Sequence, residues 1–170
     1  PQDQLLGIFK PILEGLATVH EYGFIHRDIK PRNIHIRHDG SPVLLDFGSA
    51  RDVVTNNTDE LTRLLTHGYG PYEQENPAWA AQGPWTDIYA MGATIRSCID
   101  AYAPPASNER SKKDTMKAAV DIFKKNYYQE FLKLIDWSME VDPEARPQNC
   151  QQLIDELEKL SEDFLLMRKA

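Results

Sequence analysis

The sequence predicts a mainly helical domain that carries one small β-hairpin. Over long stretches the apolar residues recur at steps of three and four, which is the period of an amphipathic helix. Residues 34–45 differ, because there the apolar positions alternate around a turn-forming segment, as they do in a hairpin. With 170 residues the chain is about one domain long and can bury roughly two-thirds of the surface that its unfolded form exposes.

The first helix is expected over residues 4–22. Its apolar residues fall on one stripe, which consists of Leu5, Ile8, Phe9, Ile12, Leu16 and Val19. Asp3 is a candidate N-cap and Gly23 a candidate stop. Because proline lacks an N–H, Pro11 inside this pattern is expected to kink the helix or to remove one hydrogen bond.

The hairpin is expected from two short strands, over residues 34–37 and 43–45. Residues 38–42 contain Gly and Pro and form the turn between the strands. This arrangement fixes Asn33 at one end of the hairpin and Asp46 at the other.

Four later segments show helical periodicity: residues 85–95, 114–125, 128–139 and 147–160. The first of them is apolar on most faces and is therefore expected to be buried, with Thr86 as its N-cap. Residues 102–113 are interpreted as a loop, and Arg110 within it as part of a solvated basic face.

Charge and composition exclude two kinds of partner. The formal charge of -7 argues against a nucleic-acid surface and against binding to anionic membranes. No apolar run approaches the length of a membrane span, and no signal-peptide pattern opens the chain. Cys98 and Cys150 lack metal-type spacing and are interpreted as small buried hydrophobes in a reducing compartment, which predicts a soluble cytoplasmic protein.

The candidate chemistry lies between residues 26 and 48. Asp28 and Asn33 are five positions apart, and Asp46 follows a short apolar run. Phosphoryl transfer needs cations held against phosphate oxygens and a residue that orients the attacking hydroxyl. Asn33 and Asp46 suit Mg²⁺, Asp28 can accept the hydroxyl proton, and Lys30 can contact the transferred phosphate. Turn capping alone would also explain the two aspartates.

Two motifs in this stretch resemble the catalytic loop and the metal loop of the protein kinases. They are the triplet His26-Arg27-Asp28, with Asn33 in register behind it, and the triplet Asp46-Phe47-Gly48. Lys30 resembles the serine/threonine-specific branch. The resemblance implies the large lobe of a kinase, ATP and Mg²⁺ as cofactors, and a protein substrate. It also implies that His35 floors the adenine pocket, where the family usually has an apolar residue.

The resemblance makes residues 46–75 the activation segment. Arg27 is the implied partner of a phosphothreonine there, and the candidate sites are Thr55, Thr58 and Thr62. The stretch that begins at Thr66 resembles the end of this segment in bacterial serine/threonine kinases, where the threonine bonds to the catalytic aspartate and lysine.

Two structural interactions follow from the same resemblance. Glu73 is implied to form a buried ion pair with Arg146, although Tyr72 stands where the family has a proline. Asp87 is implied to hold the backbone of the catalytic loop around His26. As an acidic residue in the first turn of a helix, Asp87 also has a simpler explanation in the helix dipole.

The resemblance covers residues 1–160, with residues 26–33 as catalytic loop and residues 161–170 as a tail. Nothing before His26 suits a Gly-rich phosphate loop, the phosphate-binding strand lysine or its partner glutamate. We therefore expect a kinase C-terminal lobe whose absent N-terminal lobe is a partner, and an inactive isolated chain. A pseudokinase-like binding or scaffold module and a small-molecule phosphotransferase remain as alternatives.

Overall fold

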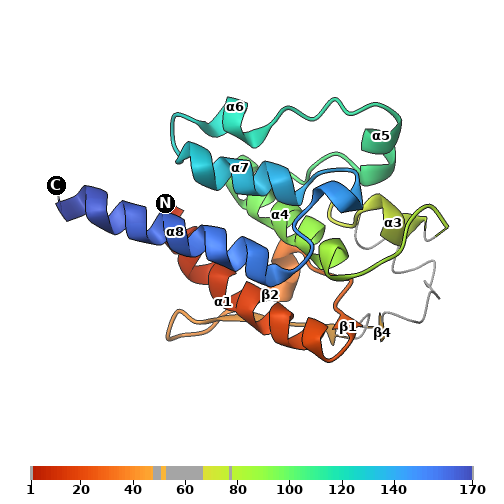
Figure 1. The fold of residues 1–170 in the computed structure, drawn as a ribbon, viewed down its shortest axis with the longest axis horizontal. Helices are drawn as coiled ribbons and strands as arrows, with labels where there is room; N and C mark the ends of the chain where they lie inside the picture. Colours follow the sequence, from red (N-terminus) through yellow and green to blue (C-terminus); the bar gives the residue numbers. More distant parts are fainter. Residues whose placement is uncertain (1, 48–50, 53–66, 77, 170) are drawn as a thin grey trace.

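The computed structural model describes residues 2–47, 51–52, 67–76 and 78–169, with backbone alone for residues 51–52 and 164–169. It confirms a mainly helical fold with a small hairpin (Figure 1). The longer helices are α1 (Gln2–Glu21), α4 (Pro84–Asp100), α7 (Gln129–Ser138) and α8 (Cys150–Lys169). None of the helices in this part of the chain is long and apolar enough to cross a bilayer.

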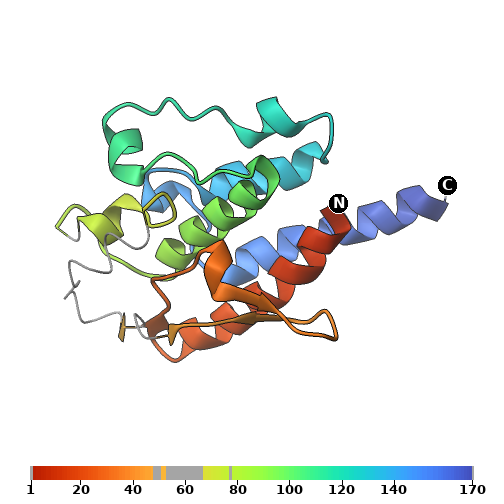
Figure 2. The ribbon, with the colours of Figure 1, turned by 180° about the vertical axis from the view of Figure 1, so that it is seen from behind.

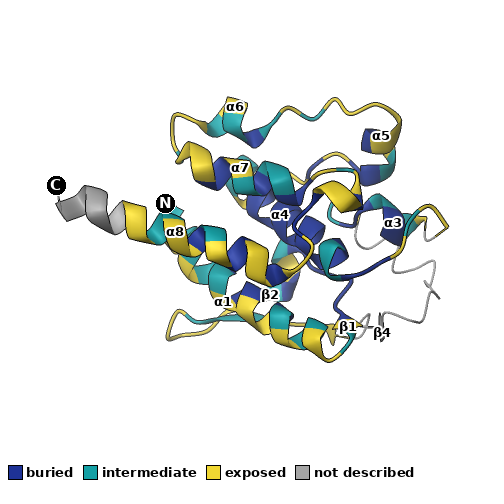
Figure 3. Ribbon diagram, viewed as in Figure 1, coloured by how far each residue is buried: buried dark blue, intermediate teal, exposed yellow. Residues whose placement is uncertain are grey.

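Helix α4 forms the centre of the molecule (Figure 3). All of its residues from 86 to 97 are buried, as the apolar pattern predicts. Thr86 is not the N-cap, however, because the helix begins at Pro84 with Gly83 as the capping position. The Thr86 hydroxyl instead accepts a hydrogen bond from the Gly83 N–H at 3.1 Å, which still satisfies one of the unpaired donors of the first turn.

Helices α1 and α8 lie side by side and close one side of the core (Figure 1). Their buried stripes include Phe9, Ile12, Leu13 and Leu16 from α1, and Leu153, Ile154 and Leu157 from α8. Helix α1 continues through Pro11 and begins before Asp3, so Asp3 lies in the first turn and is not the cap. Gly23 has a φ of 82° just after the helix ends, which confirms it as the stop.

The predicted hairpin is present and runs along the edge of α1 (Figure 2). Strands β2 (Ile34–Ile36) and β3 (Pro42–Leu44) pair antiparallel with Ile34 opposite Leu44. The 3-10 turn η1 (Pro31–Asn33) leads into β2. A second, two-residue pairing joins β1 (Phe24–Ile25) to β4 (Arg51–Asp52). Residues 26–33 therefore connect the two short sheets, from the end of β1 to the start of β2.

The segment between α4 and α7 differs from its prediction. Helix α5 (Ser107–Lys112) lies inside the expected loop, and the expected long helix reduces to α6 (Ala119–Phe123). Arg110 is 6% exposed and does not belong to a solvated face. Its guanidinium donates to the Asp114 carboxylate, the Tyr89 hydroxyl and the Met139 carbonyl. These partners compensate the burial of its charge.

The remaining elements are short or shifted at their ends. Helix α3 (Tyr72–Glu75) precedes α4, and the 3-10 turn η3 (Pro143–Ala145) lies between α7 and α8. Helix α8 begins at Cys150, so Pro147 precedes it, and the helix continues through residues 161–169. Those residues, expected as a tail, are therefore helical.

A close approach of α4 to α7 requires the glycine at position 92. A Cβ added to Gly92 would lie 2.8 Å from the Ser138 Cβ and 3.0 Å from the Met139 Cγ. We predict that Gly92→Ala lowers the free energy of unfolding by about 1–3 kcal/mol through overpacking. Gly15→Ala is the matched control, because nothing lies within 4 Å of its added Cβ. It should stabilise by about 0.5–1 kcal/mol in urea denaturation, and equal effects of the two variants would contradict this packing.

The two thiols differ in exposure, which corrects the expectation that both are buried. Cys150 is 1% exposed, whereas Cys98 is exposed. Desolvation raises the pKa of both thiols, through partial burial at Cys98 and full burial at Cys150, where the effect is stronger. A raised pKa lowers the fraction of reactive thiolate. With Ellman's reagent at pH 8, we predict slow reaction of Cys98 in the native protein and reaction of Cys150 only after unfolding. Fast modification of Cys150 in a native Cys98→Ser variant would disprove this assignment.

Candidate active site

The segment from His26 to Asn33 buries an unusual amount of charge and polarity. Five of its side chains are at most 8% exposed, and these are His26, Arg27, Asp28, Lys30 and Asn33. Burying such groups is costly unless each has hydrogen-bond or ion-pair partners. The partners therefore define the geometry of the site.

Asp28 is held from two sides. Its Oδ1 lies 2.9 Å from the Lys30 ammonium nitrogen, and its Oδ2 accepts a hydrogen bond of 2.9 Å from the Asn33 amide. The same amide nitrogen donates to the Asp28 carbonyl at 2.7 Å. The structure thus brings together the three residues that the sequence proposes as base, cation and metal ligand.

His26 links this loop to the segment that contains Asp46. Its Nδ1 accepts from the Asp28 N–H at 3.1 Å, so Nδ1 carries no hydrogen. Its Nε2 lies 3.0 Å from the Leu45 carbonyl oxygen, which can only accept, so Nε2 carries the hydrogen. His26 is therefore in one defined neutral tautomer. The Phe47 ring meets it edge to face, with centroids 4.5 Å apart.

Asn33 and Asp46 come together at the open end of the hairpin. The Leu45 N–H donates to the Asn33 carbonyl at 2.7 Å, which places Asp46 one residue from this pairing. The Asn33 side-chain nitrogen is engaged by Asp28, so its amide oxygen is the atom left for a cation. An amide oxygen and a carboxylate are both oxygen ligands of the kind that Mg²⁺ prefers.

The loop backbone is strained at two positions. Arg27 has a φ of 69° and Asp46 a φ of 61°, in the left-handed region that costs about 1–2 kcal/mol for a residue with a Cβ. The Asp87 carboxylate accepts from the N–H groups of His26 and Arg27 at 2.8 and 2.9 Å. These bonds hold the strained turn from the side of α4.

Two further residues support this turn, and sequence reasoning assigned neither of them to the loop. His20 Nε2 lies 2.8 Å from the Asp87 Oδ2, and its Nδ1 lies 3.7 Å from the Cys150 Sγ. Gln74 donates from its Nε2 to the Arg27 carbonyl at 2.6 Å. His20 is 67 residues from Asp87 in sequence, and Gln74 is 47 residues from Arg27, so no local pattern indicates either contact.

Glu73 and Arg146 form a fully buried ion pair. Their side chains are 0% and 1% exposed, and two N–O contacts of 2.6 and 3.2 Å join them. The Thr86 hydroxyl donates to Glu73 at 3.1 Å, and the Arg146 Nε donates to the Glu140 carbonyl at 2.6 Å. The Arg146 guanidinium also lies 4.8 Å from the centroid of the Tyr89 ring. The end of the expected activation segment is thereby fixed to the core.

The expected nucleotide-contacting residues lie on an exposed surface. His35 is on the exposed side of β2. In the same stretch of chain, the apolar side chains of Ile36, Leu45 and Phe47 are 43%, 45% and 46% exposed. The expected roles of Gly48, Thr55, Thr58, Thr62 and Thr66 fall outside the described residues.

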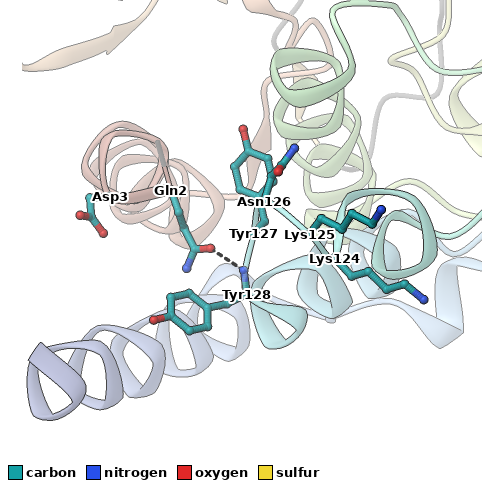
Figure 4. Close-up of a pocket in the computed structure, with 7 residues that line it drawn as sticks. All are labelled: Gln2, Asp3, Lys124, Lys125, Asn126, Tyr127 and Tyr128. Atoms are coloured by element: carbon teal, nitrogen blue, oxygen red, sulfur yellow. Dashed lines mark hydrogen bonds between the residues drawn. The ribbon is translucent and has the colours of Figure 1, made fainter. Parts of the chain in front are cut away.

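Two surface pockets differ in whether they adjoin the candidate site. An open pocket of about 490 Å³ lies between the start of α1 and residues 124–128, where Gln2 accepts from the Tyr128 N–H (Figure 4). None of the residues from 26 to 33 lines it. A pocket of about 260 Å³ lies between α1 and the hairpin and includes Phe47, so it borders the candidate site.

Comparisons with known proteins show the family of this chain. The family model described as protein kinase domain matches residues 1–157. The chain belongs to the protein kinase family. A structure titled "PpkA-294 apo form" superposes with a TM-score of 0.78 at 37% sequence identity, covering 91% of this kinase chain and 54% of that one.

The curated relatives are serine/threonine and mitogen-activated kinases. Mitogen-activated protein kinase kinase 2 of Arabidopsis thaliana is 31% identical over 157 residues, which cover 86% of this chain and 43% of that protein. Serine/threonine-protein kinase PknL of Mycobacterium tuberculosis is 33% identical over 105 residues, which cover 61% of this chain and 26% of that protein. The chain thus matches less than half the length of each of these kinases.

Removing one partner of the buried ion pair should destabilise the lobe strongly. We predict that Arg146→Ala lowers the free energy of unfolding by about 3–5 kcal/mol, because it leaves the Glu73 carboxylate buried and unpaired. The thermal midpoint should fall by roughly 10 °C. Lys159→Ala is the control, since it removes an ion pair of 2.7 Å whose side chains are 66% and 42% exposed. An unchanged midpoint for Arg146→Ala would show that the pair is not required.

Proposed function

We propose that this chain is the C-terminal lobe of a serine/threonine protein kinase that transfers the γ-phosphoryl group of ATP to a Ser or Thr hydroxyl of a protein. The observation that supports it most directly is the buried arrangement of Asp28, Lys30 and Asn33. A turn-capping aspartate needs neither a buried ammonium group nor a buried amide. The cytoplasm is the proposed compartment.

Each residue of this arrangement has a proposed role. The Asp28 carboxylate accepts the proton of the substrate hydroxyl as its oxygen attacks the phosphorus atom. The Lys30 ammonium group, 2.9 Å from Asp28, supplies positive charge toward the transferred phosphoryl group. Asn33 fixes the carboxylate through its bond to Oδ2. Thr66 is proposed to complete this group.

Asn33 and Asp46 are the proposed magnesium ligands. When bound, Mg²⁺ neutralises charge on the phosphate oxygens of the nucleotide. The proposed adenine and phosphate contacts of this lobe are His35, Phe47 and Gly48. Arg27 is the proposed partner of a phosphothreonine, with Thr55, Thr58 and Thr62 as candidates.

We propose that tight binding of the nucleotide needs a second lobe, supplied by the parent protein. The exposed apolar side chains Ile36, Leu45 and Phe47 beside the site support this, since they offer a surface to cover. The isolated chain is accordingly proposed to be inactive. The polar His35 in the adenine position favours a second candidate, a pseudokinase-like binding module.

The decisive experiment is Asp28→Asn in the full-length protein, with peptide phosphorylation as the assay. We predict a fall in kcat of about 10²–10⁴-fold, because the proton acceptor is lost. Asp39→Asn is the matched control, since Asp39 caps an exposed turn through Ser41 and lies outside the proposed machinery. Full activity of Asp28→Asn would remove the assigned base. A wild-type protein that binds ATP but transfers no phosphate would favour the alternative, a pseudokinase-like binding module.

A calorimetric titration of the 170-residue chain with ATP and Mg²⁺ tests the need for a second lobe. We expect no saturable binding below millimolar concentrations. Tight binding that Asp46→Ala abolishes would show instead that this lobe binds the nucleotide by itself.

A further inference from the structure

The peptide unit between Arg27 and Asp28 is held at both of its polar atoms. Its carbonyl oxygen accepts from the Gln74 amide at 2.6 Å, and its N–H donates to the His26 ring at 3.1 Å. A peptide unit is rigid and planar, so two such bonds fix its rotation. That rotation sets the direction in which the Asp28 side chain leaves the backbone.

Fixing this peptide matters because of the residue that precedes it. Arg27 has a φ of 69°, a conformation that residues with a Cβ adopt only when their surroundings enforce it. Asp87 holds the N–H of Arg27, on the other side of its Cα. Gln74 is therefore the contact that controls the carbonyl side of the strained residue.

Gln74 is itself held in place. It is 4% exposed and follows Glu73, whose carboxylate is joined to Arg146 and to Thr86. Its own N–H donates to the Pro71 carbonyl at 3.1 Å. The amide is thus carried by a short helix, α3, that the buried ion pair fixes to the core.

We propose that Gln74 is a positioning residue for Asp28, through which the end of the activation segment controls the orientation of the catalytic aspartate. Gln74 does so by donating a hydrogen bond to the Arg27 carbonyl and contacts no reacting atom. The inference rests on the proposed function for its effect on catalysis, but its structural part can be tested without phosphoryl transfer.

The first test is amide hydrogen exchange in the 170-residue chain, measured by NMR for Gln74→Met. This side chain has a similar length and cannot donate a hydrogen bond. We expect the amides of Arg27 and Asp28 to exchange at least tenfold faster, while those of α7 keep their rates. The control is Gln151→Met, because Gln151 also donates a side-chain hydrogen bond, to the Asp155 carboxylate on α8, away from this loop and from the Glu73–Arg146 pair.

The outcomes separate positioning from packing. Rates within twofold of wild type at Arg27 and Asp28, or equal acceleration in α7, would overturn the proposal. Acceleration at the loop by Gln151→Met would do the same, since it would show a general loss of stability.

The second test is kinetic and uses the full-length protein. Gln74→Met should lower kcat at least tenfold and leave the KM for ATP unchanged. Gln74→Glu should add a pH dependence, because a protonated carboxyl donates to the Arg27 carbonyl and an ionised one repels it. Activity should therefore fall as pH rises through the pKa of the introduced group.

A Gln74→Glu profile parallel to that of wild type, or a change in KM alone, would contradict positioning. If the wild-type protein transfers no phosphate, the proposed function fails, whereas the exchange experiment still decides the role of Gln74.

Discussion

The Asp87 carboxylate accepts hydrogen bonds from the backbone N–H groups of His26 and Arg27 and from the His20 ring, and it lies on the central buried helix α4. A buried carboxylate is stable only with such partners, and the loop needs it equally, because Arg27 adopts a left-handed conformation. The core helix α4 and the strained loop therefore stabilise each other. This mutual stabilisation fixes the loop that carries Asp28, Lys30 and Asn33.

The second anchor of the site is the Glu73–Arg146 ion pair. It connects the end of the expected activation segment to the turn before α8, across 73 residues of sequence. Because the pair is fully buried, its hydrogen bonds to Thr86 and to the Glu140 carbonyl are needed to offset desolvation. The result is a frame that holds α3 where the Gln74 side chain reaches the Arg27 carbonyl.

Sequence and structure agree best where an interaction is local or where a motif carries it. The helical stripes of α1 and α8 and the hairpin follow from periodicity, because burial of one face requires it. The identities of Asp28, Asn33, Asp46, Glu73, Asp87 and Arg146 follow from motif resemblance. Arg110 shows where prediction from residue type fails. Its charge predicts exposure, but in the structure it is buried and donates to the Tyr89 hydroxyl and the Met139 carbonyl.

The sequence by itself determined the helical class, the hairpin, the kinase motifs and the pairs of residues expected to meet. Tertiary structure alone decided the supporting roles of His20 and Gln74 and the neutral tautomer of His26. It also decided where α6 begins, because the Asp136 carboxylate accepts the first N–H groups of that helix, those of Ala119 and Val120. The physical reason is the same in each case. A hydrogen bond between distant residues leaves no periodic trace in the chain, and it exists only once packing has brought the donor to its acceptor.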